Sequence, residues 1–332
     1  MTDIIWQPSQ EHIRQSNVRR FMDKYGIRSY EELVKRSTDD TEWFWDAALK
    51  DLGIDWFKPY EKTLDASQGY AWAKWFVGGK LNIAHNCLDR YANSSRRSKI
   101  VCHWEGENSE IRRITYEQLS VEVNKLANGL KKLGVRKGDT VGIYMPMVPE
   151  TSTAFFACLK IGAICVPLFS GFAASALASR LSDAEARILL TVDGFLRRGN
   201  KIRAKREADN AVDSVKSIEH VVVYKRLGVE VAWVDGRDVW WHELIRNQSD
   251  ASTAEWMDSE DPAMILYTSG TSGKPKGAVH THAGALAQCA KELCYNLDVK
   301  DEDTFFWLTD FGWMMGPWMI IGVQSLGGSY LL

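Results

Sequence analysis

Short apolar runs alternate with amphipathic segments along most of the chain after residue 100. Continuous apolar runs without polar alternation are typical of strands buried on both faces of a parallel sheet. The runs are residues 140–145 (TVGIYM), 163–169 (AICVPLF), 186–192 (ARILLTV), 218–224 (IEHVVVY) and 263–267 (AMILY). Since the intervals between them suit helical crossovers, the pattern predicts an α/β fold: a doubly wound parallel sheet with helices on both faces.

The clearest predicted helix begins after Thr115. Thr115 and Gln118 have the spacing of a capping box, in which each side chain accepts a hydrogen bond from the other residue's backbone N–H. The helix is expected over residues 116–133, and Gly134 is expected to end it. Two further helices are expected near residues 150–161 and 175–182, between the apolar runs.

The first 80 residues differ from the rest, because they are rich in tryptophan and in charge. Residues 38–53 (TDDTEWFWDAALKDLG) predict a short amphipathic helix that ends at Gly53. Two interpretations stay open for this region: an aromatic-rich appendage packed on a larger domain, or a platform for carbohydrate. The tryptophans concerned are Trp43, Trp45, Trp56, Trp72 and Trp75.

Composition and charge narrow the class of protein. Of 332 residues, 45% are hydrophobic and 25% are charged, which excludes disordered, collagen-like and disulfide-scaffold classes. The 41 Lys and Arg nearly balance the 43 Asp and Glu, so charge gives no reason to expect nucleic acid.

The six Cys contain no C-x-x-C pair and the seven His no H-E-x-x-H, so no metal ligand is predicted. The N-terminus lacks the apolar region of a signal peptide, and a cytoplasmic location is expected.

Two uncharged stretches, residues 161–179 and 311–332, are each about long enough to span a bilayer. Their prolines and glycines favour buried strands and turns of a large α/β core instead, so no membrane span is expected. The final residues, GGSYLL, are predicted to form a strand whose neighbours in the sheet the chain does not supply.

The most specific motif is YTSGTSGKPKG at residues 267–277, after the run AMILY and before AVHTH. Its hydroxyls and glycines offer donors on a backbone that can adopt positive φ, as a polyphosphate cradle requires. Pro275 favours an extended Lys274, and Lys276 offers a cation to phosphate oxygens. The candidate binding residues are Thr268, Ser269, Gly270, Thr271, Ser272, Gly273, Lys274 and Gly277.

Two other interpretations of this motif fit less well. Pro275 stands where a Walker A loop has Ser or Thr, which argues against a P-loop kinase. A flexible linker would rarely interrupt a buried strand and continue into an apolar helix, as we expect here.

The motif and the VHTH that follows resemble the signature loop of the AMP-forming adenylating (acyl-CoA synthetase) superfamily, and the chain is more narrowly similar to the acetyl-coenzyme A synthetase branch. The supporting stretches are residues 81–91, 136–172, 217–226 and 308–318 (LTDFGWMMGPW). The resemblance implies an N-terminal extension over residues 1–85 and the first part of an AMP-binding adenylation domain over residues 86–332.

The resemblance also implies a reaction. Members condense a carboxylate with ATP to give an acyl-adenylate and pyrophosphate, and then transfer the acyl group to the thiol of coenzyme A. The implied cofactors are ATP or AMP, Mg²⁺ and coenzyme A, with a small carboxylate as substrate. Lys276 and His282 would be the catalytic residues in this chain, although packing stays an open alternative for His282 and more so for His280.

The basic segment 193–207 has two interpretations. By resemblance, Arg197 matches the first of two arginines that meet the 3′-phosphate of coenzyme A, whereas Asn200 replaces the second and Arg198 or Lys201 would have to compensate. The alternative is a solvated helix face.

Trp313, Met314 and Met315 fall where the branch builds its acyl pocket and pantetheine tunnel. Acetate-specific members have Val-Thr after the Trp, so Met314 and Met315 are a departure. Because flexible Met side chains fit varied apolar shapes, we expect a short- to medium-chain acid such as acetate or propionate. The alternative is that both Met fill the core.

The later motifs of the superfamily are absent from these 332 residues, including its C-terminal-domain Lys. We therefore expect the chain to be a fragment without adenylation turnover of its own, which an ATP–pyrophosphate exchange assay would check. A separately encoded C-terminal part is one partner to consider. The alternative is a short, non-catalytic relative that binds nucleotide or a protein partner.

Overall fold

The largest sheet of the structure has seven strands, in the order β12-β11-β8-β6-β7-β14-β15. The computed structural model describes residues 5–268 and 274–332. Neighbouring strands are parallel except β14 and β15, which are antiparallel. The strands are β6 (Thr140–Tyr144), β7 (Ile164–Pro167), β8 (Ile188–Val192), β11 (His220–Tyr224), β12 (Asp238–Trp240), β14 (Pro262–Thr268) and β15 (Lys276–Thr281).

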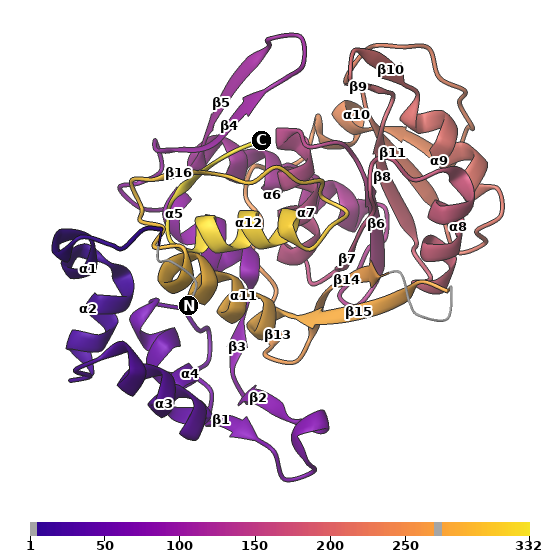
Figure 1. Cartoon of the computed structure of the whole chain (residues 1–332). Helices are drawn as coiled ribbons and strands as arrows, with labels where there is room; N and C mark the ends of the chain where they lie inside the picture. Colours follow the sequence, from indigo (N-terminus) through magenta and orange to yellow (C-terminus); the bar gives the residue numbers. More distant parts are fainter. Residues whose placement is uncertain (1–4, 269–273) are drawn as a thin grey trace.

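Helices cover both faces of this sheet, as predicted: α6 and α7 lie on one side, α8 and α9 on the other (Figure 1). The helices are α5 (Arg90–Ala92), α6 (Tyr116–Lys132), α7 (Pro149–Lys160), α8 (Ala174–Asp183), α9 (Ala204–Val212), α10 (Trp241–Ile245), α11 (His282–Lys291) and α12 (Met315–Ser325), with π-helical turns His85–Asp89 and Glu292–Asn296. The capping box at Thr115 and Gln118 is confirmed, and Gly134 follows the end of α6 with φ +89°. The predicted doubly wound α/β fold is therefore present.

A four-stranded sheet, in the order β16-β17-β4-β5, lies beside the first. Its strands are β4 (Ile100–Glu105), β5 (Ile111–Thr115), β16 (Thr304–Phe306) and β17 (Ser329–Leu331). The expectation that the final strand lacks neighbours is wrong, because Tyr330 of β17 pairs with Phe305 on one side and Cys102 on the other. Cys102 lies more than 200 residues away in the chain, so a local pattern cannot show this pairing.

Two other expectations fail locally. Residues 311–332 form the buried helix α12 as well as a strand, because an apolar run without periodicity fits a buried helix as well as a buried strand. The motif at 267–277 does not continue straight into a helix: β15 comes first, and α11 begins at His282 with Thr281 as its cap.

The basic segment 193–207 is not a single helix face. Its first part is a β-hairpin of β9 (Phe195–Arg197) and β10 (Asn200–Ile202), and α9 begins only at Ala204. The two glycines that flank Phe195 to Arg198 allow the chain to turn there.

From residue 5 onward, the tryptophan-rich region forms four helices and three short strands: α1 (Gln10–Gln15), α2 (Asn17–Lys24), α3 (Tyr30–Asp39), α4 (Thr41–Asp51), β1 (Lys62–Asp65), β2 (Lys74–Val77) and β3 (Lys80–Leu81), with a 3₁₀ turn Tyr70–Trp72. β3 pairs with β13 (Met257–Asp258). The predicted short helix is α4. Trp45, Trp56 and Trp75 pack against the main core, and Trp43 against a smaller one, whereas Trp72 is exposed. This packing favours the appendage over the carbohydrate platform.

Within residues 5–268 and 274–332, no helix is both long enough and apolar enough to cross a membrane. All six cysteines are buried free thiols. Burial raises the pKa of several of them, such as Cys102 to about 12.

Candidate functional site

The carboxyl ends of the parallel strands meet at one edge of the large sheet, where α/β proteins commonly bind ligands. At this edge lies a cavity of about 740 Å³, which we call the sheet-edge cavity. Loops that follow β6, β7, β8 and β11 line it, together with the β4–β5 loop and the segment before α12. Its lining residues are 104–108, 146–148, 169–170, 195–198, 226, 308–310, 313 and 332.

Arg197 and Trp313, two residues predicted for cofactor binding, both line this cavity. The Arg197 guanidinium lies 5.1 Å from the centroid of the Phe169 ring, and that ring lies 5.4 Å from the Trp313 ring. Phe169 thus joins a cation and an exposed indole that are more than 100 residues apart in the chain. Met314 and Met315 do not line the cavity: both are half-buried against the core at the start of α12.

Asp310 is a cavity residue that the sequence analysis missed. Its carboxylate accepts hydrogen bonds from the Ser170 hydroxyl, from the Ser170 N–H (3.2 Å) and from the Gly312 N–H (2.9 Å). Burial raises the pKa of Asp310, while these three donors act against the rise. The available signal was the position of Ser170 directly after an apolar run, at the carboxyl end of β7.

The phosphate-type motif begins and ends at the same edge. Thr268 ends β14 and Lys276 begins β15, and the two pair in the antiparallel ladder. Lys274 and Lys276 are exposed. Gly277 pairs with Tyr267, and a Cβ at this glycine would lie 2.8 Å from Ile265 Cγ2. The predicted residues Ser269, Gly270, Thr271, Ser272 and Gly273 lie outside the described residues.

A series of ring contacts connects this hairpin with the sheet-edge cavity. The Phe169 ring lies 5.4 Å from Phe172, and the Arg180 guanidinium lies 4.2 Å from Phe172 and 5.9 Å from Tyr267. The Tyr267 hydroxyl donates to Asp183 (2.7 Å). Burial and this carboxylate raise the pKa of Tyr267, so its hydroxyl stays protonated and keeps the bond.

His282 is fully buried at the first position of α11. The Ile83 N–H donates to its Nδ1 over a long 3.4 Å, and Nε2 has no partner among the described residues. Burial lowers the pKa of His282 to about 3, so the ring is neutral. Burial also lowers the pKa of half-buried His280. This location supports the packing alternative for His282, and its catalytic role stays a prediction.

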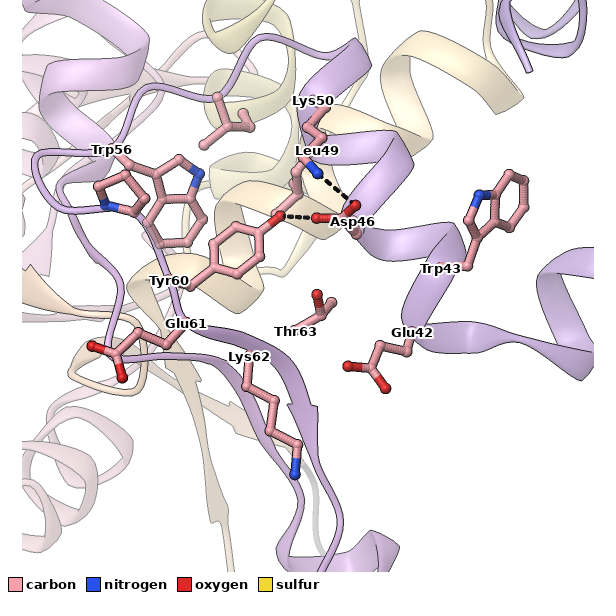
Figure 2. Close-up of a pocket in the computed structure, with 12 residues that line it drawn as sticks. Glu42, Trp43, Asp46, Leu49, Lys50, Trp56, Tyr60, Glu61, Lys62 and Thr63 are labelled. Carbon is pink, nitrogen blue, oxygen red and sulfur yellow. Dashed lines mark hydrogen bonds and ion pairs between the residues drawn. The ribbon is translucent and has the colours of Figure 1, made fainter.

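A separate cavity of about 600 Å³ lies in the N-terminal region between α4 and the segment that leads into β1 (Figure 2). The Tyr60 hydroxyl donates to Asp46 (2.6 Å), which also pairs with Lys50 (2.7 Å). Trp43 lines this cavity, but the Arg36 guanidinium lies 3.5 Å from its ring centroid and covers the ring. None of the predicted site residues is in this cavity.

Comparison with known proteins gives two family matches and close relatives. The family model described as "AMP-binding enzyme" matches residues 88–332, and that described as "Acetyl-coenzyme A synthetase N-terminus" matches residues 30–87. Over 330 residues the chain is 44% identical to an acetyl-coenzyme A synthetase of Methanothrix thermoacetophila, covering 99% of this chain and 50% of that protein. Over 303 residues it is 45% identical to one from Streptomyces coelicolor, covering 91% of this chain and 46% of that protein.

Among solved structures, an acetoacetyl-CoA synthetase from Streptomyces lividans matches with a TM-score of 0.91 at 28% identity. The match covers 99% of this chain and 51% of that chain. The chain therefore spans about half the length of the relatives that it matches.

Proposed function

The chain belongs to the AMP-binding enzyme family, and on that premise we propose that it carries the nucleotide-binding part of an AMP-forming acid–CoA ligase. In the proposed reaction a carboxylate oxygen attacks the α-phosphorus of ATP, and pyrophosphate leaves. The thiol of coenzyme A then attacks the acyl carbon, and AMP leaves. One observation carries the proposal: β14 ends and β15 begins at the same sheet edge as the cavity with Arg197 and Trp313.

The residues around the motif fit a bound polyphosphate. Thr268, Lys274 and Lys276 are exposed at the carboxyl end of β14, where a hydroxyl and two cations can reach phosphate oxygens. Attack by a carboxylate on a phosphate brings two anions together, so cations that meet the phosphate oxygens lower the barrier. We assign Lys276 this role, and residues 268–277 the cradle.

We propose that Mg²⁺ binds to this chain together with ATP. The described residues hold no group of three or more His, Cys, Asp or Glu arranged to bind a metal. Mg²⁺ in nucleotide sites is commonly held by phosphates, water and one or two carboxylates, so a dedicated protein cage is not needed. When bound, the ion would neutralise charge on the phosphates, and Lys276 would add to that effect.

Coenzyme A and the acid are assigned to the sheet-edge cavity. Arg197 is proposed to meet the 3′-phosphate of coenzyme A, and Trp313 to border the acyl group, with Met314 and Met315 behind it. The substrate is proposed to be a short- to medium-chain acid such as acetate or propionate; the similarity to acetyl-coenzyme A synthetases supports this, since Met314 and Met315 do not line the cavity. A cytoplasmic location and a separately encoded C-terminal part are also proposals; the six free cysteines support the former, because disulfides are rare in the cytosol.

Binding of ATP by titration calorimetry tests the proposal. Lys276→Ala is expected to weaken ATP binding roughly tenfold or more, because it removes a charged hydrogen bond to phosphate. Lys74→Ala is the matched control, since Lys74 is an exposed lysine on β2, in another part of the fold. Equal ATP affinity of the wild type and Lys276→Ala would contradict the role of Lys276, and no ATP binding by the wild type would contradict the proposed function.

A further inference from the structure

The turn between β9 and β10 has an unusual backbone. Arg197 pairs with Asn200, so the hairpin loop is only Arg198 and Gly199. Both adopt positive φ, +53° and +75°, as in a type I′ turn. Glycine accepts this conformation freely, but a residue with a Cβ such as Arg198 does so at a cost. Since a hairpin with three residues in each strand is marginal on its own, this turn needs support from outside.

Glu107 supplies that support. It lies in the loop between β4 and β5, and its two carboxylate oxygens accept hydrogen bonds from the Arg198 N–H (2.8 Å) and the Gly199 N–H (2.9 Å). Successive backbone N–H groups in such turns form a concave anion site, and here a side chain of the same chain occupies it. The bonds from Gly199 and Arg198 lower the pKa of Glu107, so it is ionised at neutral pH.

The loop that carries Glu107 is anchored independently of it. Glu110 pairs with Arg226 (2.8 Å), which follows β11. The Arg226 guanidinium lies 4.8 Å from the Trp104 ring, and the Trp104 indole N–H donates to the Met147 carbonyl (2.9 Å). Glu107 therefore reaches the turn from a fixed point, and its removal leaves these other contacts in place.

Arg197 depends on this hairpin for its position. It directly precedes the turn and lines the sheet-edge cavity, where its guanidinium lies against Phe169. Within the part of the chain that the structure describes, no carboxylate lies within ion-pair distance of it. The Asp310 and Glu107 carboxylates act on its charge from beyond that distance. The guanidinium can therefore still pair with an anionic ligand, and its placement follows from the turn one residue away.

We propose that Glu107 is a positioning residue: by holding the amides of Arg198 and Gly199, it sets the Arg197 guanidinium to meet an anionic group of a ligand in the sheet-edge cavity. The inference rests on the proposed function only for the identity of that group, the 3′-phosphate of coenzyme A. Removing Glu107 should therefore weaken recognition of the phosphate while leaving the rest of the cavity unchanged.

The first experiment measures affinity for coenzyme A and for 3′-dephospho-coenzyme A by titration calorimetry. Glu107→Ala is expected to reduce the preference for coenzyme A roughly tenfold, with little effect on the dephospho form. Glu105→Gln is the control, because it removes one negative charge from the same cavity rim without touching the turn. If Glu107 acted only through its charge, its removal would strengthen anion binding in the way that Glu105→Gln does, and that result would overturn the proposal.

The second experiment introduces a residue that favours the turn conformation without help from Glu107. Asn followed by Gly is the preferred sequence for a type I′ turn, so Arg198→Asn should make the hairpin less dependent on Glu107. Because Arg198 itself lines the cavity, the preference for coenzyme A is first measured for Arg198→Asn alone, and the effect of Glu107→Ala is taken relative to that value. The fold-loss of this preference caused by Glu107→Ala should be several times smaller in the Arg198→Asn background than in the wild type. An equal loss in both backgrounds would show that Glu107 does not act through the turn.

A third measurement separates this inference from the proposed function. Amide hydrogen exchange, read residue by residue by NMR, should show the Arg198 and Gly199 amides exchanging at least tenfold faster in Glu107→Ala than in the wild type. Unchanged exchange overturns the role of Glu107 whatever the ligand is. If the two amides exchange faster in Glu107→Ala but the wild type binds no coenzyme A, then Glu107 does hold the turn. In that case the proposed ligand is wrong, and the role of Glu107 stands.

Discussion

Gly312 lies against the backbone at the end of β7, and a Cβ at this position would be 2.0 Å from the Phe169 amide nitrogen. Only a residue without a side chain allows the segment before α12 to come this close. That approach brings Asp310 to Ser170 and Trp313 to Phe169. The absence of a side chain at Gly312 thus allows the segment before α12 to pack against the segment after β7, and these form two sides of the sheet-edge cavity.

We predict that Gly312→Ala lowers the free energy of unfolding by about 3 kcal/mol, because the Phe169 backbone cannot move aside as a flexible side chain would. Urea unfolding measures this. Gly236→Ala is the control: Gly236 has φ +83° but no atom within 4 Å of the added Cβ, so only the backbone conformation is strained, at about 1 kcal/mol. Equal losses for the two variants would argue against the close approach at Gly312.

The burial of His282 predicts how the free energy of unfolding depends on pH. Because burial lowers its pKa to about 3, the unfolded chain binds a proton between that value and the ordinary 6.5 that the folded chain does not. The unfolded state is then favoured as the pH falls, and His282 contributes at most about 1.4 kcal/mol of lost stability for each pH unit in this window. His282→Gln should unfold with a weaker pH dependence between pH 6.5 and 4. Parallel curves for variant and wild type would contradict the buried, neutral ring.

At the scale of elements, β17 shows how a three-residue strand can hold a sheet together. It lies between β16 and β4, and Tyr330 at its centre is fully buried, with its hydroxyl donating to Ser152 (2.9 Å). The strand thereby connects β4 and β16, two segments that lie far apart in the chain. Its neighbours are set by tertiary contacts and not by any nearby turn.

Tyr330→Ala is predicted to lower the free energy of unfolding by about 3–5 kcal/mol, because it leaves a cavity in place of a buried ring. Tyr330→Phe keeps the ring and removes only the hydroxyl, so its cost should be about 1 kcal/mol. Chemical unfolding of both variants separates the cost of losing the buried ring from the cost of losing the hydroxyl. A Tyr330→Ala cost no larger than that of Tyr330→Phe would mean that β17 is not packed between its neighbours.

At the scale of the whole molecule, Asp51 joins the N-terminal helices to the α/β part. Its side chain is fully covered, and it accepts from Arg20 (2.9 Å), Lys24 (3.0 Å) and Tyr295 (2.8 Å). Tyr295 belongs to the segment after α11, so this carboxylate connects two regions that are more than 200 residues apart. Asn17 adds backbone and side-chain bonds to the same segment.

We predict that Asp51→Ala lowers the free energy of unfolding by about 2 kcal/mol: it leaves the Tyr295 hydroxyl without its partner, while solvent screens the half-exposed Arg20 and Lys24. Limited proteolysis should also cut sooner between the N-terminal helices and the rest. Asp39→Ala, which removes an exposed pair with Lys35, should change stability by about 0.5 kcal/mol or less. A change as small for Asp51→Ala would contradict its connecting role.

Residues close together in the chain predicted the local structure and the chemistry that we propose. Apolar runs required buried strands, Thr115 and Gln118 predicted the start of α6, and residues 267–277 indicated a phosphate cradle, because each depends on residues close in the chain. The partners of β17, the covering of Asp310 and the hold of Glu107 on the turn beside Arg197 became visible only in the folded molecule. These depend on contacts between distant segments, whose energy lies in packing and paired polar groups and leaves no period or motif in the sequence.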